Sequence, residues 1–199
     1  MAEAETLKRR AEAEAAELVR RMAAGDRDAF AGLLAIYQPK ALRAAYLISG
    51  NFADSEDIVQ ETFVACWLNR RQLKNPGAFP CWFYKTLSRI AWRVCKKRNR
   101  EQPVEELFPP EAKTAENLLD GVLMKEEEKL LSEAVAGLPV KQRTMVVLYY
   151  YNGLSIREIA AACGVLEGTV KSRLFHGKER LRKILKERGE GGRPWTILS

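Results

Sequence analysis

Apolar residues recur every three or four positions along most of the chain, and no segment shows the regular alternation of apolar and polar residues that is typical of a half-buried strand. The pattern therefore predicts an all-α protein. Glycine, proline and capping residues divide the pattern into helices. In the first half we expect helices at about 4–24, 26–37, 41–48, 54–70 and 80–99, with a new start after Pro39 and a cap at Asp54 or Ser55. In the second half we expect helices at about 122–136 and 140–151, one that begins at Ser155, and one at about 169–186.

Residues 154–185 have the pattern of a helix-turn-helix. Ser155 is followed three residues later by Glu158, which forms a capping box that begins a helix. Ala160 then supplies a small residue where two helices can cross, and Gly164 supplies a residue that accepts positive φ in the turn. This spacing predicts two short helices that pack across each other.

The second helix of this segment combines an apolar stripe with basic faces. The stripe consists of Val170, Leu174, Leu181 and Leu185. The basic residues are Lys171, Arg173, Lys178, Arg180, Arg182, Lys183, Lys186 and Arg188, against only Glu179 and Glu187. Such a helix can enter a major groove with its first turns and neutralise phosphates with later side chains, so we favour DNA binding. The alternative is a solvated basic face on an ordinary helical hairpin.

Composition narrows the function further. The 199 residues, 47% of them hydrophobic, suffice for one medium or two small domains, and the net charge of +7 indicates a polyanionic partner. The sequence shows neither a signal peptide nor an apolar run long enough to cross a bilayer, so we expect a cytoplasmic protein without membrane insertion. The four cysteines are far apart and His176 is the only histidine, so we expect no metal site and no cofactor.

A shift in composition predicts the domain boundary. Residues 101–121 are rich in proline and acidic residues and have weak periodicity, as a flexible linker does. We expect a helical extension at 1–25, a first domain at 26–100, the linker at 101–121, a second domain at 122–188 and a tail at 189–199. The second domain is expected to be a winged-helix-like four-helix domain that contains the helix-turn-helix.

The helix expected at 81–100 provides a second basic surface. It has no acidic residue, and its basic side chains lie opposite an apolar stripe that begins at Phe83 and Leu87. Aromatic residues interleave with the charge, so this surface could hold unstacked bases as well as duplex DNA. Core packing is the alternative for each ring. The residues concerned are Phe79, Trp82, Tyr84, Trp92, Lys85, Arg89, Arg93, Lys96, Lys97 and Arg100.

The helix expected to begin near residue 54 has the opposite charge. Its acidic residues are Asp54, Glu56, Asp57 and Glu61. They would repel DNA, whereas a protein partner that offers Arg or Lys would fit them, with Gln60 available as a hydrogen-bonding neighbour. A well-capped surface helix is an equally good interpretation, because acidic residues stabilise a helix N-terminus. No nucleophile motif, phosphate loop or histidine lies nearby, so we expect no catalytic residue and no enzyme activity.

Five segments follow one another in a specific order. They are DSEDIVQETF (54–63), WFYKTLSRI (82–90), the acidic Pro-rich linker, LPVKQRTMVVLYYYNGLSIREIA (138–160) and GTVKSRL (168–174). In this order the chain resembles a bacterial sigma factor of the extracytoplasmic-function type over about residues 26–186. The resemblance implies a non-enzymatic subunit that binds core RNA polymerase and directs promoter-specific transcription initiation. Such a subunit recognises minus-thirty-five and minus-ten elements and assists strand opening.

The resemblance also implies site residues. The clamp helices of the beta-prime subunit would contact Asp54, Glu56, Asp57, Gln60 and Glu61. Melted minus-ten DNA would contact Asn75, Phe79, Tyr84, Lys85, Ser88, Arg89, Trp92, Arg93, Lys96 and Lys97. Double-stranded minus-thirty-five DNA would contact Arg143, Ser155, Thr169, Lys171, Ser172, Arg173, Phe175, His176 and Lys178, and the second domain would dock on the beta flap. Arg89 and His176 stand where relatives often carry Asn and Arg.

An anti-sigma factor that clamps between the two domains is a further implied partner.

Three other classes of protein remain open. A stand-alone helix-turn-helix repressor is disfavoured by the acidic helix and the second basic helix, and a recombinase or transposase is disfavoured by the lack of a nucleophile or metal-binding carboxylates. A sigma-related interaction protein that has lost promoter binding stays possible because of Arg89 and His176.

Overall fold

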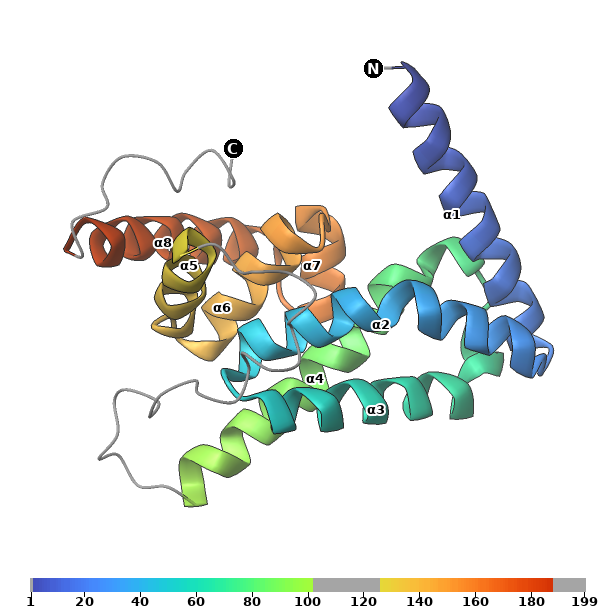
Figure 1. Ribbon diagram of the computed structural model, residues 1–199, viewed down its shortest axis with the longest axis horizontal. Coiled ribbons are helices and arrows are strands. Elements are labelled where there is room, and N and C mark those ends of the chain that lie inside the picture. The colour runs from blue at the N-terminus through green and yellow to red at the C-terminus, as the bar shows by residue number, and fades with distance from the viewer. Residues whose placement is uncertain (1, 102–125, 188–199) are drawn as a thin grey trace.

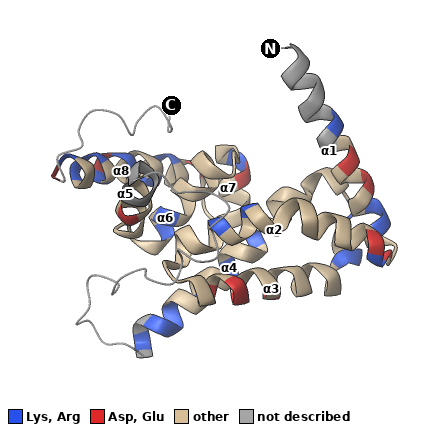
Figure 2. Ribbon diagram, viewed as in Figure 1, with Lys and Arg blue, Asp and Glu red and all other residues tan. Residues whose placement is uncertain are grey.

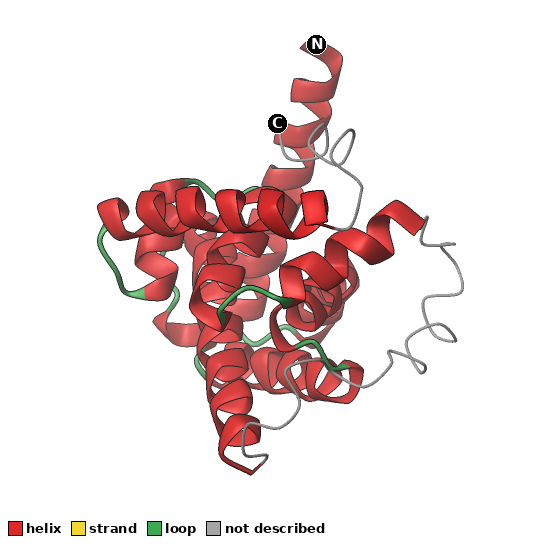
Figure 3. Ribbon diagram, turned by 90° about the vertical axis from the view of Figure 1, so that its left-hand side faces the viewer, coloured by secondary structure: helices red, strands yellow, loops and turns green. Residues whose placement is uncertain are grey.

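The computed structural model describes residues 2–101 and 126–187, and every regular element in these ranges is a helix (Figures 1 and 3). The first range contains α1 (Ala2–Ala23), α2 (Arg27–Ser49), α3 (Phe52–Leu68), the 3-10 helices η1 (Arg70–Gln72) and η2 (Pro76–Ala78), and α4 (Phe79–Glu101). The second contains α5 (Glu126–Ala136), α6 (Val140–Val146), the π-helix η3 (Val147–Tyr151), α7 (Ile156–Cys163) and α8 (Glu167–Glu187). The prediction of an all-α protein with two helical domains is confirmed: α1–α4 form the first and α5–α8 the second.

Parts of the predicted organisation fall on residues outside the described ranges. The expected linker, apart from its first residue, and the expected tail at 189–199 lie outside the described residues. The expected domain boundaries therefore stay predictions. Within the described ranges, no helix is both long enough and apolar enough to cross a membrane.

Helix ends are set by side-chain caps and by glycine. The Asp26 carboxylate accepts a hydrogen bond from the backbone N–H of Ala29 (3.1 Å) at the start of α2, and this bond is the main reason that the pKa of Asp26 is lowered. Ser155 and Glu158 form the predicted capping box at the start of α7. Gly164 ends α7 with a φ of 65°, which glycine adopts without strain. These local predictions are confirmed.

Two expected boundaries in the first domain are wrong. Helix α2 continues through Pro39, because buried residues before and after the proline share one face that packs on α3 and α4. Burial of this face outweighs the helix-breaking tendency of an interior proline. Helix α3 is capped by Asn51, whose side-chain oxygen accepts a hydrogen bond from the backbone N–H of Asp54 at 2.9 Å. Asp54 and Ser55 therefore lie inside the helix that one of them was expected to cap.

The first domain packs around a cluster of aromatic rings. The ring of Phe83 in α4 lies 5.1 Å from that of Phe63 in α3 and 5.3 Å from that of Tyr37 in α2, measured between centroids. Helix α1 adds the fully buried side chains of Val19 and Met22 to the same core. Part of the expected N-terminal extension therefore belongs to the hydrophobic core.

The second domain depends on a close approach of α6 and α8. Gly177 in α8 is buried against α6, and a Cβ atom at this position would lie 2.9 Å from Cγ2 of Val146 and 3.3 Å from Cγ of Gln142. The predicted apolar stripe of α8, which includes Val170 and Leu181, is buried. Only a residue without a side chain lets the two helices meet at this distance.

We expect Gly177→Ala to lower the free energy of unfolding by about 1–3 kcal/mol, because the new methyl group overlaps the buried and β-branched side chain of Val146. Gly168→Ala is the matched control in the same helix, since nothing lies within 4 Å of its added Cβ. That control should stabilise the protein by about 0.4–1 kcal/mol. Urea unfolding followed by circular dichroism measures both changes, and equal effects would contradict this account of the α6–α8 contact.

Candidate functional site

The two domains pack directly on each other. Helix α4 of the first domain contacts α6 and α7 of the second, and α2 contacts α5, α6 and η3 (Figure 1). Among the described residues, two hydrogen bonds between side chains cross the α4 side of this interface. The indole N–H of Trp92 donates to Oγ1 of Thr144 at 2.8 Å, and Nδ2 of Asn152 donates to the hydroxyl oxygen of Tyr84 at 2.9 Å.

This packing separates the residues expected to bind minus-ten DNA into two groups. Tyr84 and Ser88 are 4% and 0% exposed, and Trp92 is half-buried. All three lie on the stripe of α4 that faces the second domain. Burial raises the pKa of the Tyr84 hydroxyl. Phe79 is buried in the core of the first domain. This ring therefore packs in the core, which was the alternative to base binding.

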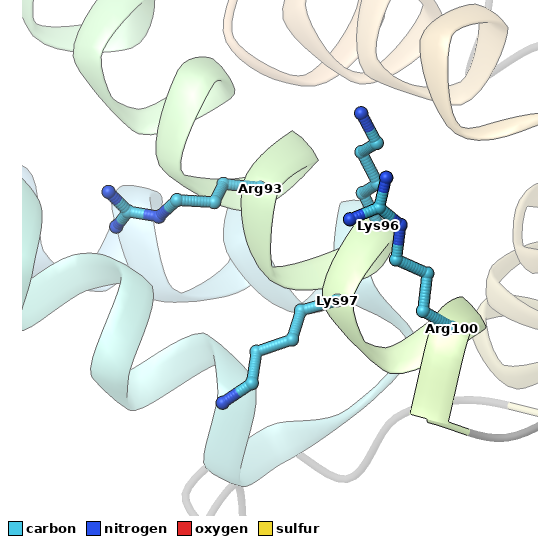
Figure 4. A pocket seen from close by; sticks show the side chains of 4 residues that line it. All are labelled: Arg93, Lys96, Lys97 and Arg100. Atoms are coloured by element: carbon cyan, nitrogen blue, oxygen red, sulfur yellow. The ribbon is translucent and has the colours of Figure 1, made fainter.

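The other expected minus-ten residues face solvent. They are Asn75, Lys85, Arg89, Arg93, Lys96 and Lys97. The Asn75 side chain accepts a hydrogen bond from the backbone N–H of Gly77 and so shapes the turn at η2. Figure 2 shows Lys and Arg at the C-terminal end of α4, where Arg93, Lys96, Lys97 and Arg100 line a hollow of about 420 Å³ (Figure 4). In Figure 4, Arg93 and Lys97 extend towards one side of the helix, and Lys96 and Arg100 both point upwards in the view. Four cationic side chains on one helix end can neutralise backbone phosphates.

The acidic residues of α3 also divide into two groups. Asp54 is paired with Arg98 at 2.8 Å, and Glu61 is paired with Arg93, so these two carboxylates join α3 to α4. The other two acidic residues, Glu56 and Asp57, are exposed and have no ion pair with another described residue, and the neutral side chain of Gln60 beside them is also exposed. Exposed apolar side chains continue this surface at Val64 and Leu68. The free part of the acidic surface is therefore smaller than the sequence suggested.

Arg143 has a different environment from the one expected of a minus-thirty-five contact. Its guanidinium donates hydrogen bonds to the carbonyl oxygens of Ile48 in the first domain (2.9 Å) and of Leu138 in the second (2.9 Å), and also to that of Ala136. Burial lowers the pKa of Arg143. Arg143 therefore links the domains and, in this arrangement, is not available to DNA.

The helix-turn-helix presents a polar and basic surface on α8. Lys171, Ser172, Phe175 and His176 are exposed, and Phe175 is 64% exposed, which is high for so large an apolar side chain. Of the other expected contacts, Arg173, Lys178 and Thr169 are half-buried, and the Ser155 hydroxyl is used by the capping box. The structure thus brings four of the expected residues together on one open face.

A groove between α6 and α8 adds residues that the sequence did not single out. It has a volume of about 490 Å³ and is lined by Pro139, Lys141, Gln142, Arg173, His176 and Arg180. Oε1 of Gln142 and Nη1 of Arg173 are buried there without a hydrogen-bond partner among the described residues. The cationic lining and the unpartnered Nη1 of Arg173 suit a phosphate group, whereas Oε1 of Gln142 is an acceptor and would need a donor from another group. No sequence pattern pointed to Lys141 or Gln142, because both precede the helix-turn-helix.

The described residues give no support for metal or thiol chemistry. No group of three or more His, Cys, Asp or Glu side chains within them could hold a metal ion. Cys66, Cys95 and Cys163 are buried free thiols, and burial raises the pKa of Cys66 to about 12 and that of Cys163 to about 11. Such thiols are poor nucleophiles near neutral pH.

The fold and the two basic surfaces define a two-domain, helix-turn-helix DNA-binding protein, and comparisons with known proteins specify the family. Residues 33–101 match the model of Sigma-70 region 2, and residues 128–181 match that of Sigma-70 region 4. The chain belongs to the ECF RNA polymerase sigma factors. It therefore directs transcription initiation, and the repressor and recombinase alternatives fall away.

Several relatives support this assignment. The ECF sigma factor SigW of Bacillus subtilis is 32% identical, over 85% of this chain and 95% of the relative. The ECF sigma-E factor of Salmonella typhimurium is 32% identical, over 82% of this chain and 90% of the relative. Among solved structures, CnrH bound to the cytosolic domain of CnrY has a similar fold, with a TM-score of 0.64, 22% identity, and coverage of 87% of this chain and 98% of that one. The sigma factor RpoE of Bartonella quintana, solved with the anti-sigma factor NepR, has a TM-score of 0.62 at 24% identity over 79% of this chain and 96% of that one.

We expect Arg143→Ala to lower the free energy of unfolding by about 1–3 kcal/mol, because the partly buried carbonyl oxygens of Ile48, Leu138 and Ala136 lose this donor. Arg157→Ala removes the same type of side chain from an exposed position of α7 and should change stability by less than about 0.5 kcal/mol. Thermal unfolding of both variants compares them. If the two were equally stable, the linking role of Arg143 would be refuted.

Proposed function

We propose that this sigma factor docks on core RNA polymerase through α3, reads the minus-thirty-five element with α8 and holds the melted minus-ten strand on α4. The observation that carries the proposal is the presence, in one chain, of an exposed reading face on a helix-turn-helix and a second basic helix with aromatic residues. Neither surface is required if the protein only binds another protein.

The minus-thirty-five step uses the N-terminal half of α8. Lys171 and His176 can approach base edges or phosphates in the major groove, and Phe175 can contact a thymine methyl group. Lys141 of α6 and Arg180 of α8 line the groove between these two helices, where a backbone phosphate would be neutralised. These contacts fix the register of the protein on the promoter.

The minus-ten step uses α4. Tyr84 and Trp92 contact the second domain here, so bases would stack on them only after the domains separate. That stacking would offset part of the cost of opening a few base pairs, and the basic side chains at the C-terminal end of α4 would follow the strand. A base that is bound on α4 is not available for pairing in the duplex. Recognition of the strand and strand opening would therefore occur together.

Docking on polymerase uses the exposed part of the acidic surface. Asp57, with Glu56 and Gln60 beside it, is suited to a basic helical partner such as the beta-prime clamp helices, and the second domain would contact the beta flap. Once both domains are docked, their spacing matches the promoter and two modest DNA contacts act together. Because core RNA polymerase acts in the cytoplasm, we propose that this chain acts there too.

We also propose that an anti-sigma factor regulates this chain, because the structure of RpoE of Bartonella quintana was solved in complex with the anti-sigma factor NepR.

The whole proposal is tested by adding the purified protein to core polymerase and a library of promoter fragments. Specific run-off transcripts that require this chain are the expected result. Failure to bind core polymerase and to select any promoter would overturn the proposal.

Asp57→Lys should raise the Kd for core polymerase by at least about tenfold, because it places a like charge against a basic partner at the centre of the exposed acidic surface. Glu14→Lys makes the same charge change on the exposed surface of α1 and should leave the Kd unchanged. Fluorescence titration of labelled variants with core polymerase gives both values, and equal Kd values would remove the docking role of Asp57.

Lys171→Ala should weaken minus-thirty-five binding and reduce the slope of log K against log salt by about one, as expected when one phosphate contact is lost. Lys40→Ala removes an exposed lysine of α2 and should leave the slope as it is. Promoter binding by the complex with core polymerase is measured across a salt series. An unchanged slope for Lys171→Ala would exclude a phosphate contact at that residue.

A further inference from the structure

The groove between α6 and α8 contains the only histidine of the chain. His176 lines this groove together with Lys141 and Gln142 of α6 and with Arg173 and Arg180 of α8. The three α8 residues recur at three- and four-residue spacing, so they lie on one face of the helix. An imidazole and three cationic side chains therefore surround one hollow.

This face of α8 differs from the open face beside it. Phe175 lies about 100° round the helix from His176 and is 64% exposed, whereas His176 stands beside α6. Helix α6 comes close here because Gly177 has no side chain: a Cβ atom at Gly177 would lie 3.3 Å from Cγ of Gln142. A side chain that shares a hollow with a second helix is set back from the base edges. The DNA backbone is the part of a duplex that can reach it.

Two buried polar atoms in the groove require partners of opposite kinds. Nη1 of Arg173 is a donor and Oε1 of Gln142 is an acceptor, and neither has a hydrogen-bond partner among the described residues. Nε2 of Gln142 already donates to the carbonyl oxygen of Arg173 at 3.3 Å. A phosphate oxygen can accept from Arg173 but has no proton for Gln142. A neutral imidazole has one N–H group, whereas an imidazolium has two.

We infer that this groove holds one phosphate of the minus-thirty-five DNA backbone and that His176 binds that phosphate as an imidazolium. One N–H group donates to the phosphate oxygen, and the second is available to Oε1 of Gln142. The extra proton comes from solvent, so DNA binding takes up one proton. The inference rests on the proposed function, because it takes α8 as the helix that binds minus-thirty-five DNA. It assigns His176 to the backbone rather than to a base edge.

The charges around the imidazole favour an external anion. No carboxylate lines the groove, and Glu179, the only acidic residue of α8 within one turn of His176, is paired with Arg182. Other charged side chains that the structure describes on helices packed against α8 also lie outside the groove lining: Glu133 of α5, Arg143 of α6, and Arg157 and Glu158 of α7. A phosphate is therefore the group that can neutralise an imidazolium here.

The contact makes promoter binding depend on pH. Histidine is the side chain that ordinarily changes its charge between about pH 5 and pH 8. An anion favours the charged form, so phosphate binding and protonation of His176 strengthen each other. The contribution of His176 should consequently be present at low pH and be lost as the pH rises.

The test compares three full-length chains, each assembled with core polymerase, on a promoter fragment selected in the run-off assay. His176→Gln is neutral at every pH and His176→Arg is charged at every pH, so the two variants bracket the wild type. From about pH 8 to about pH 6, the affinity of the wild type relative to His176→Gln should rise about fivefold to tenfold. The affinity of His176→Arg relative to His176→Gln should stay constant. In the wild type alone, the slope of log K against log salt should steepen by about one.

Modified DNA distinguishes a phosphate contact from a base contact. Uncharged methylphosphonate linkages are placed one at a time along both strands of the minus-thirty-five element. One such linkage should remove the gain of the wild type at low pH and leave His176→Gln unaffected. If the gain survives every linkage but is lost on substitution of one base pair, His176 reads a base and the inference is refuted.

The inference and the proposed function fail in different ways. If a promoter is selected and all three chains show the same dependence on pH, the inference is refuted alone. If no promoter is selected, the proposed function is refuted and the inference falls with it. Because the chain has one histidine, a gain at low pH that both variants lack is assigned to His176.

Discussion

The structure depends on the division of α4 into three faces. One face, centred on Phe83 and Leu87, closes the core of the first domain. A second face carries Tyr84, Ser88 and Trp92 into the interface with the second domain, and a third carries basic side chains into solvent. A helix has room for three such faces only if the residues of each recur at three- or four-residue spacing. Each turn of α4 is therefore constrained on all sides, and a change of register by one residue would disrupt packing, domain contact and charge together.

Helix packing determines which charged residues of α3 and α4 form ion pairs with each other. Arg98 and Arg93 pair with Asp54 and Glu61 across the two helices. Pairs as exposed as Arg93–Glu61 add little stability, since water screens them. They hold two carboxylates of α3 against α4 while all four side chains stay partly exposed. The charges outside these pairs form a compact acidic surface around Asp57 on one helix and a basic surface that includes Lys96 and Arg100 on the other.

The features that the sequence predicted correctly are those that depend on residues close together in the chain. The capping box at Ser155 and Glu158, the Asp26 cap and the apolar stripe of α8 depend on residues within a few positions of one another, and all are confirmed. Continuation of α2 through Pro39 depends on burial against other helices, which no local pattern records. The same holds for the site: Arg143 looked like any other basic residue of a DNA-binding domain, but its partner carbonyl oxygen at Ile48 is 95 residues away. Contacts between the domains could not be predicted because neither half carries a complementary sequence signal.

The two domains pack on each other in a closed state, and their separation would give an open state. A partner shifts a two-state equilibrium only through its different affinities for the two states. Binding to α3 alone would not favour the open state, because its exposed acidic surface is available in both. A partner that holds both domains at a fixed separation, however, binds only the open state and exposes the α4 stripe as it does so. A partner that contacts only one domain therefore leaves the equilibrium unchanged, whereas simultaneous contacts on both domains would shift it towards the open state.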